Sequence, residues 1–226
     1  MVHFLHVYWG TIRYACQFAK KGRSCRCYSS VSRWHSHAGL QRGDGVAGAL
    51  IVRQPKDQDP NKDHYDEDKH EHVVVVQDWS HGLSVTEFNK AVYGMDDSSP
   101  SAILINGKGG QNTISSKRPK RCTATDGGGK FDSDCPFPRY EQFDVELGKR
   151  FRFRVISTAT YRDCGMRISV DNHNMTVIAT DGASVQPYEC QSFVIYNAER
   201  YDFILNANQD ADNYWMRVTV NILKLI

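Results

Sequence analysis

Short runs of apolar residues, separated by turn-forming residues, dominate the chain after residue 72. Two of these runs are continuous, HVVVVQDW (72–79) and SAILING (101–107), which is typical of buried strands. In RFRFRVIS (150–157), apolar side chains alternate with three arginines, so the two kinds would occupy opposite faces of a strand. Further strand-like segments follow: RISVDNHNMTVIATDG, CQSFVIY, RYDFILNA and YWMRVTVNILKL. Many short strands with Asn, Asp, Gly and Pro between them predict a β-sandwich.

One segment has the signature of a helix. Residues 84–87, Ser-Val-Thr-Glu, fit a capping box, in which Ser84 caps the first turn and Glu87 bonds back to it. Leu83 and Phe88 are spaced as a hydrophobic staple, and Gly94 would end the helix. We therefore expect a short helix that packs on the edge of the sheet.

The segment QPKDQDPNKDHYDEDKHE (54–71) is strongly polar and nearly free of apolar residues. Its composition predicts a linker between a small, irregular part (1–53) and a part long enough for a complete sandwich (72–226). Its aspartates imitate a calcium-binding loop. However, Lys62 stands where that loop requires glycine, and Pro60 disturbs the turn. A solvated linker is therefore the preferred interpretation.

The overall composition limits the classes of partner. The chain has 226 residues, 40% of them hydrophobic and 24% charged, and a formal net charge of +2. These values are ordinary for a globular protein and indicate neither a nucleic-acid nor a membrane partner. No apolar run reaches the roughly 18 residues of a membrane helix. The opening MVHFLHVYW is too short, and too interrupted by histidine, for a signal peptide, so no leader is visible.

Seven cysteines are present, and no two of them form a C-x-x-C motif. The last four could form two disulfides, for instance Cys122–Cys135 and Cys164–Cys190, although the sequence leaves the pairing open. A sequon begins at Asn174 and is compatible with a secreted protein.

Two H-x-H pairs, His35/His37 and His70/His72, are candidates for metal binding. On a strand, residues i and i+2 point to one face with about 7 Å between their Cα atoms, so two imidazoles there can bind one metal ion or two neighbouring ions. His70 and His72 follow the acidic segment, and we interpret them as an exposed strand entrance. His173 lacks the cysteine spacing of a blue-copper site, which favours a buried, hydrogen-bonded histidine.

The flanks of His35 and His37 distinguish the first pair. WHSHAGLQRGDGVAGALIVRQ resembles the second copper motif of the multicopper oxidases, most closely that of the animal laccases. Later segments resemble the same family in order, so that the resemblance covers about residues 33–222: VVVVQDWSH, ILINGKG, FRFRVIS, SVDNHNMTVIATDG and ERYDFILNA. The resemblance implies an all-β, cupredoxin-like Greek-key β-sandwich. Residues 1–53 would end a truncated first cupredoxin domain, and 72–226 would form a complete second domain without copper ligands.

The same resemblance implies a chemistry. Multicopper oxidases carry a type 1 copper, which takes electrons from the substrate, and a trinuclear cluster that reduces dioxygen to water. His35 and His37 would each ligate one of the two type 3 coppers, with Trp34 and Asp44 as structural neighbours. The resemblance also implies phenolic or diphenolic small-molecule substrates, dioxygen as the second substrate, and secretion.

Other motifs of that family do not occur in this sequence. It contains no H-W-H-G, H-P-x-H-x-H-G or H-C-H, so the type 1 site and the rest of the cluster are absent from it. We therefore expect an incomplete, inactive fragment of a laccase-like oxidoreductase. The alternatives are a non-catalytic cupredoxin module with at most weak metal binding, and an adventitious mononuclear site at His35 and His37.

Overall fold

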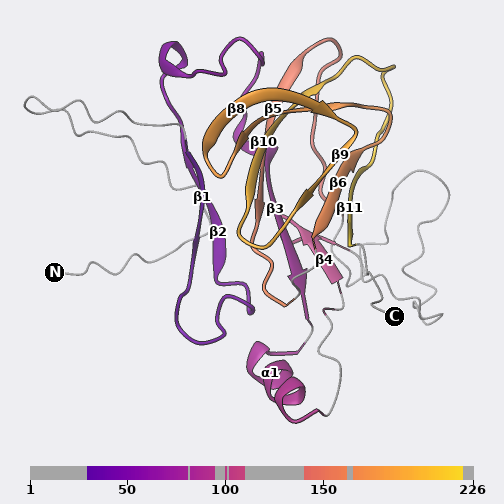
Figure 1. Ribbon diagram of the computed structural model, residues 1–226. Helices are drawn as coiled ribbons and strands as arrows, with labels where there is room; N and C mark the ends of the chain where they lie inside the picture. Colours follow the sequence, from indigo (N-terminus) through magenta and orange to yellow (C-terminus); the bar gives the residue numbers. More distant parts are fainter. Residues whose placement is uncertain are drawn as a thin grey trace, which may run out of the picture.

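The computed structural model describes residues 30–80, 82–94, 100, 102–109, 140–161 and 165–220. Within these residues the chain is mostly β-structure (Figure 1). The strands are β1 Ser30–His35, β2 Ala47–Val52, β3 Val73–Trp79, β4 Ala102–Ile105, β5 Arg150–Ser157, β6 Met166–Val170, β7 Met175–Thr180, β8 Ala183–Cys190, β9 Ser192–Ile195, β10 Arg200–Asn206 and β11 Met216–Val220. The helices are the 3-10 turns η1 Lys56–Gln58 and η2 His70–His72, and the α-helix α1 Ser84–Val92.

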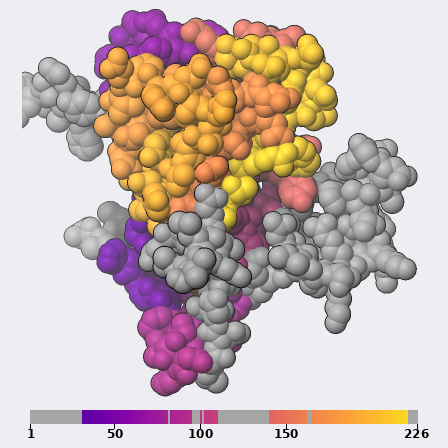
Figure 2. All heavy atoms as spheres, turned by 45° about the vertical axis from the view of Figure 1, so that its right-hand side comes forward, coloured from indigo at the N-terminus to yellow at the C-terminus, as the bar shows by residue number. Residues whose placement is uncertain are grey.

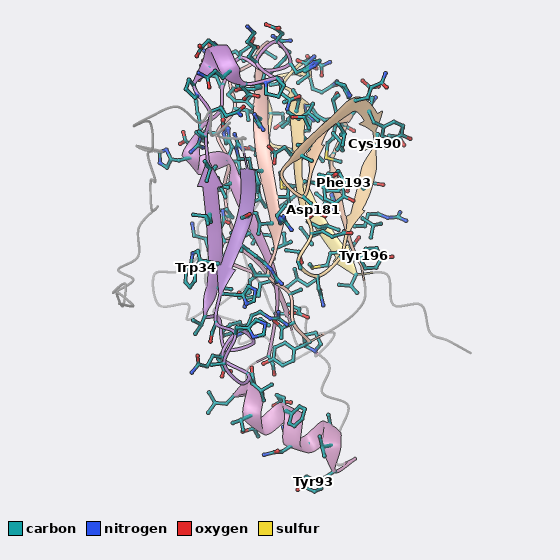
Figure 3. All side chains as sticks on the ribbon, turned by 60° about the vertical axis from the view of Figure 1, so that its left-hand side comes forward. Trp34, Tyr93, Asp181, Cys190, Phe193 and Tyr196 are labelled. Carbon is teal, nitrogen blue, oxygen red and sulfur yellow. The ribbon has the colours of Figure 1, made fainter. Side chains whose placement is uncertain are left out.

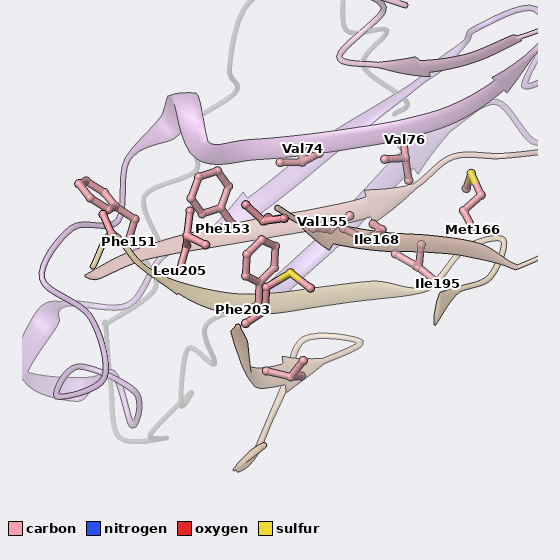
Figure 4. Close-up of a cluster of buried hydrophobic side chains, with 14 of the residues drawn as sticks. Val74, Val76, Phe151, Phe153, Val155, Met166, Ile168, Ile195, Phe203 and Leu205 are labelled. Carbon is pink, nitrogen blue, oxygen red and sulfur yellow. The ribbon is translucent and has the colours of Figure 1, made fainter. Parts of the chain in front are cut away.

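Two sheets pack face to face and form the predicted sandwich. The larger has the order β4-β3-β5-β10-β7-β8 and the smaller the order β11-β6-β9. Apolar side chains from both sheets meet in one buried cluster (Figure 4). It includes Val74 and Val76 of β3, Phe151, Phe153 and Val155 of β5, Met166 and Ile168 of β6, Ile195 of β9, and Phe203 and Leu205 of β10. Burial of this cluster is the main source of stability, because apolar surface leaves water there.

The arginines of β5 lie on the opposite face from its phenylalanines, as predicted, but two of them are buried. The side chains of Arg152 and Arg154 are only 2% and 1% exposed. Nη1 of Arg152 lies 2.7 Å from Asp59, and Nη2 of Arg154 lies 2.6 Å from Asp68. Both guanidinium groups also contact Asp202 of the neighbouring strand β10. The face is therefore covered by the acidic segment 54–71.

The prediction that segment 54–71 is solvated is wrong for its middle. Asp59, Asn61 and Tyr65 are buried, and Asp59 accepts a hydrogen bond of 2.7 Å from the Tyr65 hydroxyl. Acidic composition indicated exposure, but these carboxylates are neutralised by arginines that lie about ninety positions later in the chain. Buried charges are tolerated when they are paired in this way.

The helix α1 forms where it was predicted, with a different N-terminus. Leu83 is its N-cap residue, and no side chain of the capping box bonds to it. Gly94, at φ +63°, ends it as expected. Leu83, Phe88 and other apolar side chains of α1 are exposed, so the predicted packing on a sheet edge is wrong. The helix projects from one end of the sandwich (Figures 1 and 2).

No helix of the described residues is both long and apolar enough to cross a membrane.

Candidate metal centre

The two histidines of the first H-x-H pair lie at the end of a β-hairpin. His35 is the last residue of β1, where it pairs with Ala47 of β2, and His37 lies just beyond the strand. The ring centroids are 6.1 Å apart, and the ring planes are inclined by 28°. His35 is half-buried and His37 is exposed. The chain therefore brings two imidazoles side by side at an accessible position.

The local hydrogen bonding of His35 determines which ring nitrogen can bind a metal. Its Nδ1 lies 3.0 Å from the carbonyl oxygen of Ser36. A carbonyl oxygen only accepts, so Nδ1 carries the proton in this bond. In the neutral ring, Nε2 then has the free lone pair that a metal ion requires. Such second hydrogen bonds are typical of metal-binding histidines, because they fix the ring orientation.

A compact turn follows the two histidines and closes back on Ser36, which lies between them. The amide of Ser36 donates to Val46 at 2.9 Å, and its hydroxyl donates to Oε1 of Gln41 at 2.6 Å. The amide of Val46 donates to the carbonyl of Gln41 at 3.1 Å. Gly45 adopts φ +93°, a conformation that favours glycine. The turn is thus held by bonds of its own.

The same turn contacts the start of α1. The Ser84 amide donates to Oδ1 of Asp44 at 2.7 Å, and the Ser84 hydroxyl lies 2.5 Å from that of Tyr161. A side chain at Gly43 would place Cβ 2.3 Å from the Ser84 hydroxyl oxygen, so the backbone approaches closely there. Asp78 of β3 accepts from the amide of Tyr161 at 2.8 Å. These contacts connect the histidine turn to the larger sheet.

Trp34 precedes the pair on β1, opposite Gly48 of β2 (Figure 3). Its indole nitrogen lies 2.7 Å from the place where a Cβ of residue 48 would stand. Glycine at 48 therefore leaves the space that the indole occupies. The contact of Trp34 with this strand is therefore one of packing.

The donor set near the pair fits copper only in part. Imidazole is a good ligand for copper ions. Among the described residues, however, no group of three or more His, Cys, Asp or Glu side chains could hold a metal ion together. His35 and His37 therefore supply two nitrogen donors, and the remaining positions of a bound ion need other ligands.

The second H-x-H pair does not form a comparable arrangement. His72 is fully buried and stacks on Phe153 with 4.5 Å between the ring centroids, so its predicted place at an exposed strand entrance is wrong. Its Nε2 lies 3.0 Å from the carbonyl of Asp144, and burial lowers its pKa. His70 is exposed, as predicted, and contacts Glu71. The two residues occupy a 3-10 turn, where successive side chains point in different directions.

His173 matches its prediction. It is 8% exposed, its Nδ1 lies 2.8 Å from the carbonyl of Asp171, and its ring packs edge-on against Tyr214. Cys190 is a half-buried thiol, whose pKa is raised by burial. The other partners of the suggested disulfides, Cys122, Cys135 and Cys164, lie outside the described residues.

Comparison with known proteins gives a consistent result. The family model described as "Multicopper oxidase" matches residues 61–224. Laccase-1 of Fomitopsis schrenkii is 35% identical over 186 residues, which are 82% of this chain and 29% of that protein. Laccase-2 of Trametes villosa is 36% identical over 188 residues, 83% of this chain and 30% of that protein. These relatives are fungal, whereas the sequence motif suggested the animal branch.

Solved structures support the fold. The laccase from Botrytis aclada is 31% identical, with a TM-score of 0.62 over 84% of this chain and 31% of that one. Fet3p, a multicopper oxidase that functions in iron import, is 18% identical, with a TM-score of 0.59 over 86% of this chain and 30% of that one. The predicted all-β, cupredoxin-like sandwich is confirmed. The chain spans about 30% of the length of the curated relatives it matches.

Proposed function

Since the chain belongs to the multicopper oxidase family, we propose that it is part of a laccase-like enzyme, which oxidises phenolic or diphenolic substrates with dioxygen. Each substrate molecule would give up one electron, and four electrons with four protons convert one dioxygen to two waters. The observation that carries this proposal is the pair of adjacent imidazoles, His35 and His37, within a sequence that matches laccases. The complete activity would need the parts of the relatives that this chain does not span.

We propose that His35 and His37 each bind one copper of a type 3 pair. Bound copper would supply one-electron redox chemistry. The protein would contribute geometry: the Nδ1 proton of His35 is held by the Ser36 carbonyl, which leaves Nε2 for a metal ion. Two side-by-side rings 6.1 Å apart are compatible with one ion or with two neighbouring ions, and family membership favours two.

A second candidate concerns these 226 residues alone. Two imidazoles without a third ligand in the described residues favour a non-catalytic cupredoxin module that binds copper weakly. The sequence also has no H-C-H motif, and therefore no type 1 thiolate beside a cluster histidine. Without that electron entry, the polypeptide alone would not couple substrate oxidation to dioxygen reduction.

One set of measurements tests both candidates. The full chain is titrated with Cu(II), and its copper content and its oxygen consumption with a diphenol are measured. We expect weak copper binding that is lost in the double variant His35→Ala/His37→Ala and retained in His70→Ala, the exposed histidine of the other pair. Oxygen consumption should stay at the background rate. Copper binding that survives in the double variant would contradict the ligand assignment, and turnover would contradict the inactive module.

We propose that the protein is secreted, as its resemblance to laccases implies, and that its sequon carries a glycan. Asn174, the first residue of the sequon, is exposed, and its amide nitrogen donates to Glu189 at 3.0 Å. An exposed side chain can carry a glycan. Production of the chain with a secretion signal in a eukaryotic host, followed by glycosidase treatment, should show a mass shift that is absent in Thr176→Ala.

A further inference from the structure

We propose that Asp44 is a positioning residue for the histidine pair: its carboxylate holds the turn after His37 against α1 and thereby fixes the orientation of the His35 imidazole. This inference rests on the proposed role of His35 and His37 as copper ligands. Asp44 itself would bind no metal, and it follows His37 by seven residues in the sequence.

The hairpin that carries the histidines is anchored at two ends. At the end away from the histidines, Val31 and Ile51 pack against Ile156 of β5. Arg200 of β10 also donates from Nε to the carbonyl of Val31 at 3.0 Å. This end therefore has both apolar packing and a hydrogen bond to the larger sheet. Val31 lies four residues before His35 along β1. Its contacts therefore do not hold the histidine end of the hairpin, which needs contacts of its own.

Asp44 provides a hydrogen bond at the histidine end. Its Oδ1 accepts from the Ser84 amide at 2.7 Å, although much of the Asp44 side chain is exposed. Ser84 is the first residue of α1 and is itself buried. The first amides of a helix have no partner within the helix, and a carboxylate is favoured there by charge as well as by hydrogen bonding. The hydrogen bond between Asp44 and the Ser84 amide therefore holds the histidine turn against the start of α1.

Hydrogen bonds within the turn connect Asp44 to the residue between the two histidines. The Asp44 amide donates to the carbonyl of Gln41 at 3.1 Å, and Gln41 accepts from the Ser36 hydroxyl at 2.6 Å. Ser36 also supplies the carbonyl that fixes the His35 ring. A short series of hydrogen bonds through Gln41 and Ser36 thus connects Asp44 to the Ser36 carbonyl, which selects the tautomer of His35.

Four variants of the full chain separate this bond from its surroundings. Asp44→Ala removes the acceptor, and Asp44→Asn retains an acceptor oxygen. Ser84→Pro removes the amide donor, yet proline is well tolerated at the first position of a helix. The preceding Leu83 has ψ 140°, the extended conformation that a following proline requires. Ser84→Ala keeps the amide and removes only the hydroxyl that contacts Tyr161, which makes it the matched control.

The measurements are the Kd for Cu(II), the electron paramagnetic resonance spectrum of the bound ion and the hydrogen exchange of residues 38–46. We expect Asp44→Ala and Ser84→Pro to raise the Kd about 3- to 10-fold, at or below the usual effect of outer contacts on metal affinity. Both should change the spectrum and speed up exchange. Asp44→Asn keeps the acceptor oxygen but loses the charge, so its Kd should rise less than that of Asp44→Ala. Ser84→Ala should resemble the unmodified chain, and the double variant Asp44→Ala/Ser84→Pro should be no worse than either single one.

The two proposals fail in different ways. If His35→Ala/His37→Ala loses copper while Asp44→Ala keeps the original Kd and spectrum, the positioning role is overturned and the ligand assignment stands. If His35→Ala/His37→Ala keeps its copper, the ligand assignment is overturned, and the role of Asp44 in copper binding falls with it. A Kd that rises equally in Asp44→Asn and Asp44→Ala would also overturn the positioning role, because the acceptor oxygen would then not matter.

Discussion

Oδ2 of Asp59 lies 2.7 Å from Nη1 of Arg152, and their side chains are only 4% and 2% exposed. Asp59 belongs to the acidic segment 54–71, and Arg152 lies in the middle of β5. The same Asp59 oxygen accepts from the Tyr65 hydroxyl at 2.7 Å. The pair therefore joins a segment with the composition of a linker to the centre of the larger sheet.

We predict that Asp59→Ala lowers the free energy of unfolding by about 3 kcal/mol, because removing one partner of a buried ion pair leaves the other charge poorly compensated. Urea denaturation of the full chain measures this change. Asp57→Ala is the matched control, since Asp57 lies two residues earlier and is exposed. Its effect should stay within about 0.5 kcal/mol. Similar losses in the two variants would show that the ion pair is not what stabilises the segment.

A second prediction concerns His72 and acid. Burial lowers the pKa of its imidazole below the usual 6.5, against the raising effects of the Asp144 carbonyl and of Glu71. The unfolded chain therefore binds a proton near pH 6.5 that the folded chain does not, and stability falls as the pH drops below that value. Well above pH 6.5 the imidazole is neutral in both states, and it contributes no pH dependence.

Replacing His72 should remove this part of the acid sensitivity. Phenylalanine can take over the stacking on Phe153, since the present ring centroids are 4.5 Å apart. We expect the free energy of unfolding of His72→Phe to fall less steeply between pH 6.5 and 5 than that of the unmodified chain. His70→Ala, at the exposed position, should keep the original slope. Parallel curves for His72→Phe and the unmodified chain would exclude His72 as a source of the pH dependence.

The sequence predicted the strands well and their partners less well. Alternation in β5 correctly placed its phenylalanines and arginines on opposite faces, because the period of a strand is two residues. It gave no indication that Arg152 and Arg154 would be covered, since the covering carboxylates are far away in the chain. At α1, a helix forms where the capping box predicted one, but no side chain of that box caps its first turn. The actual acceptor for the Ser84 amide is Asp44, forty residues earlier, which a local motif does not reveal.

For the candidate metal centre, too, the sequence predicted some features correctly and others wrongly. The flanking motif singled out His35 and His37, and the structure places their rings side by side. His72, in the other H-x-H pair, was misplaced, because a polar neighbourhood in sequence indicated exposure although the ring packs between Phe151 and Phe153. Local composition predicts exposure only when no distant segment covers the residue.

Close packing at Gly43 leads to a third prediction. A Cβ at this position would lie 2.3 Å from the Ser84 hydroxyl oxygen. Gly43→Ala should therefore destabilise the chain by about 1–3 kcal/mol, the usual cost of overpacking. Adding Ser84→Ala removes the clashing oxygen and should recover most of that loss, although Ser84→Ala alone gives no gain. If the two substitutions are simply additive in urea denaturation, the contact between Gly43 and Ser84 does not limit the packing.

The last prediction concerns the division of the chain. We propose that residues 1–53 end a first cupredoxin domain and that the second, complete domain of residues 72–226 needs the segment 54–71 for its stability. A fragment 72–226 would lack Asp59 and Asp68, leaving Arg152 and Arg154 with Asp202 as their shared buried carboxylate. Two buried cations with one anion are unfavourable. Fragment 54–226 should therefore unfold cooperatively, whereas 72–226 should unfold at a clearly lower urea concentration or aggregate.

A rescue variant makes the cause specific. In fragment 72–226, Arg152→Met would leave one buried arginine, Arg154, with one carboxylate, Asp202, and an apolar side chain of similar length in place of the other cation. Such replacements of buried charges are often neutral or stabilising. We expect Arg152→Met to raise the unfolding midpoint of 72–226 and to lower that of 54–226, where the Asp59 carboxylate loses its partner. The same direction of change in both fragments would contradict charge imbalance as the reason that the segment is needed.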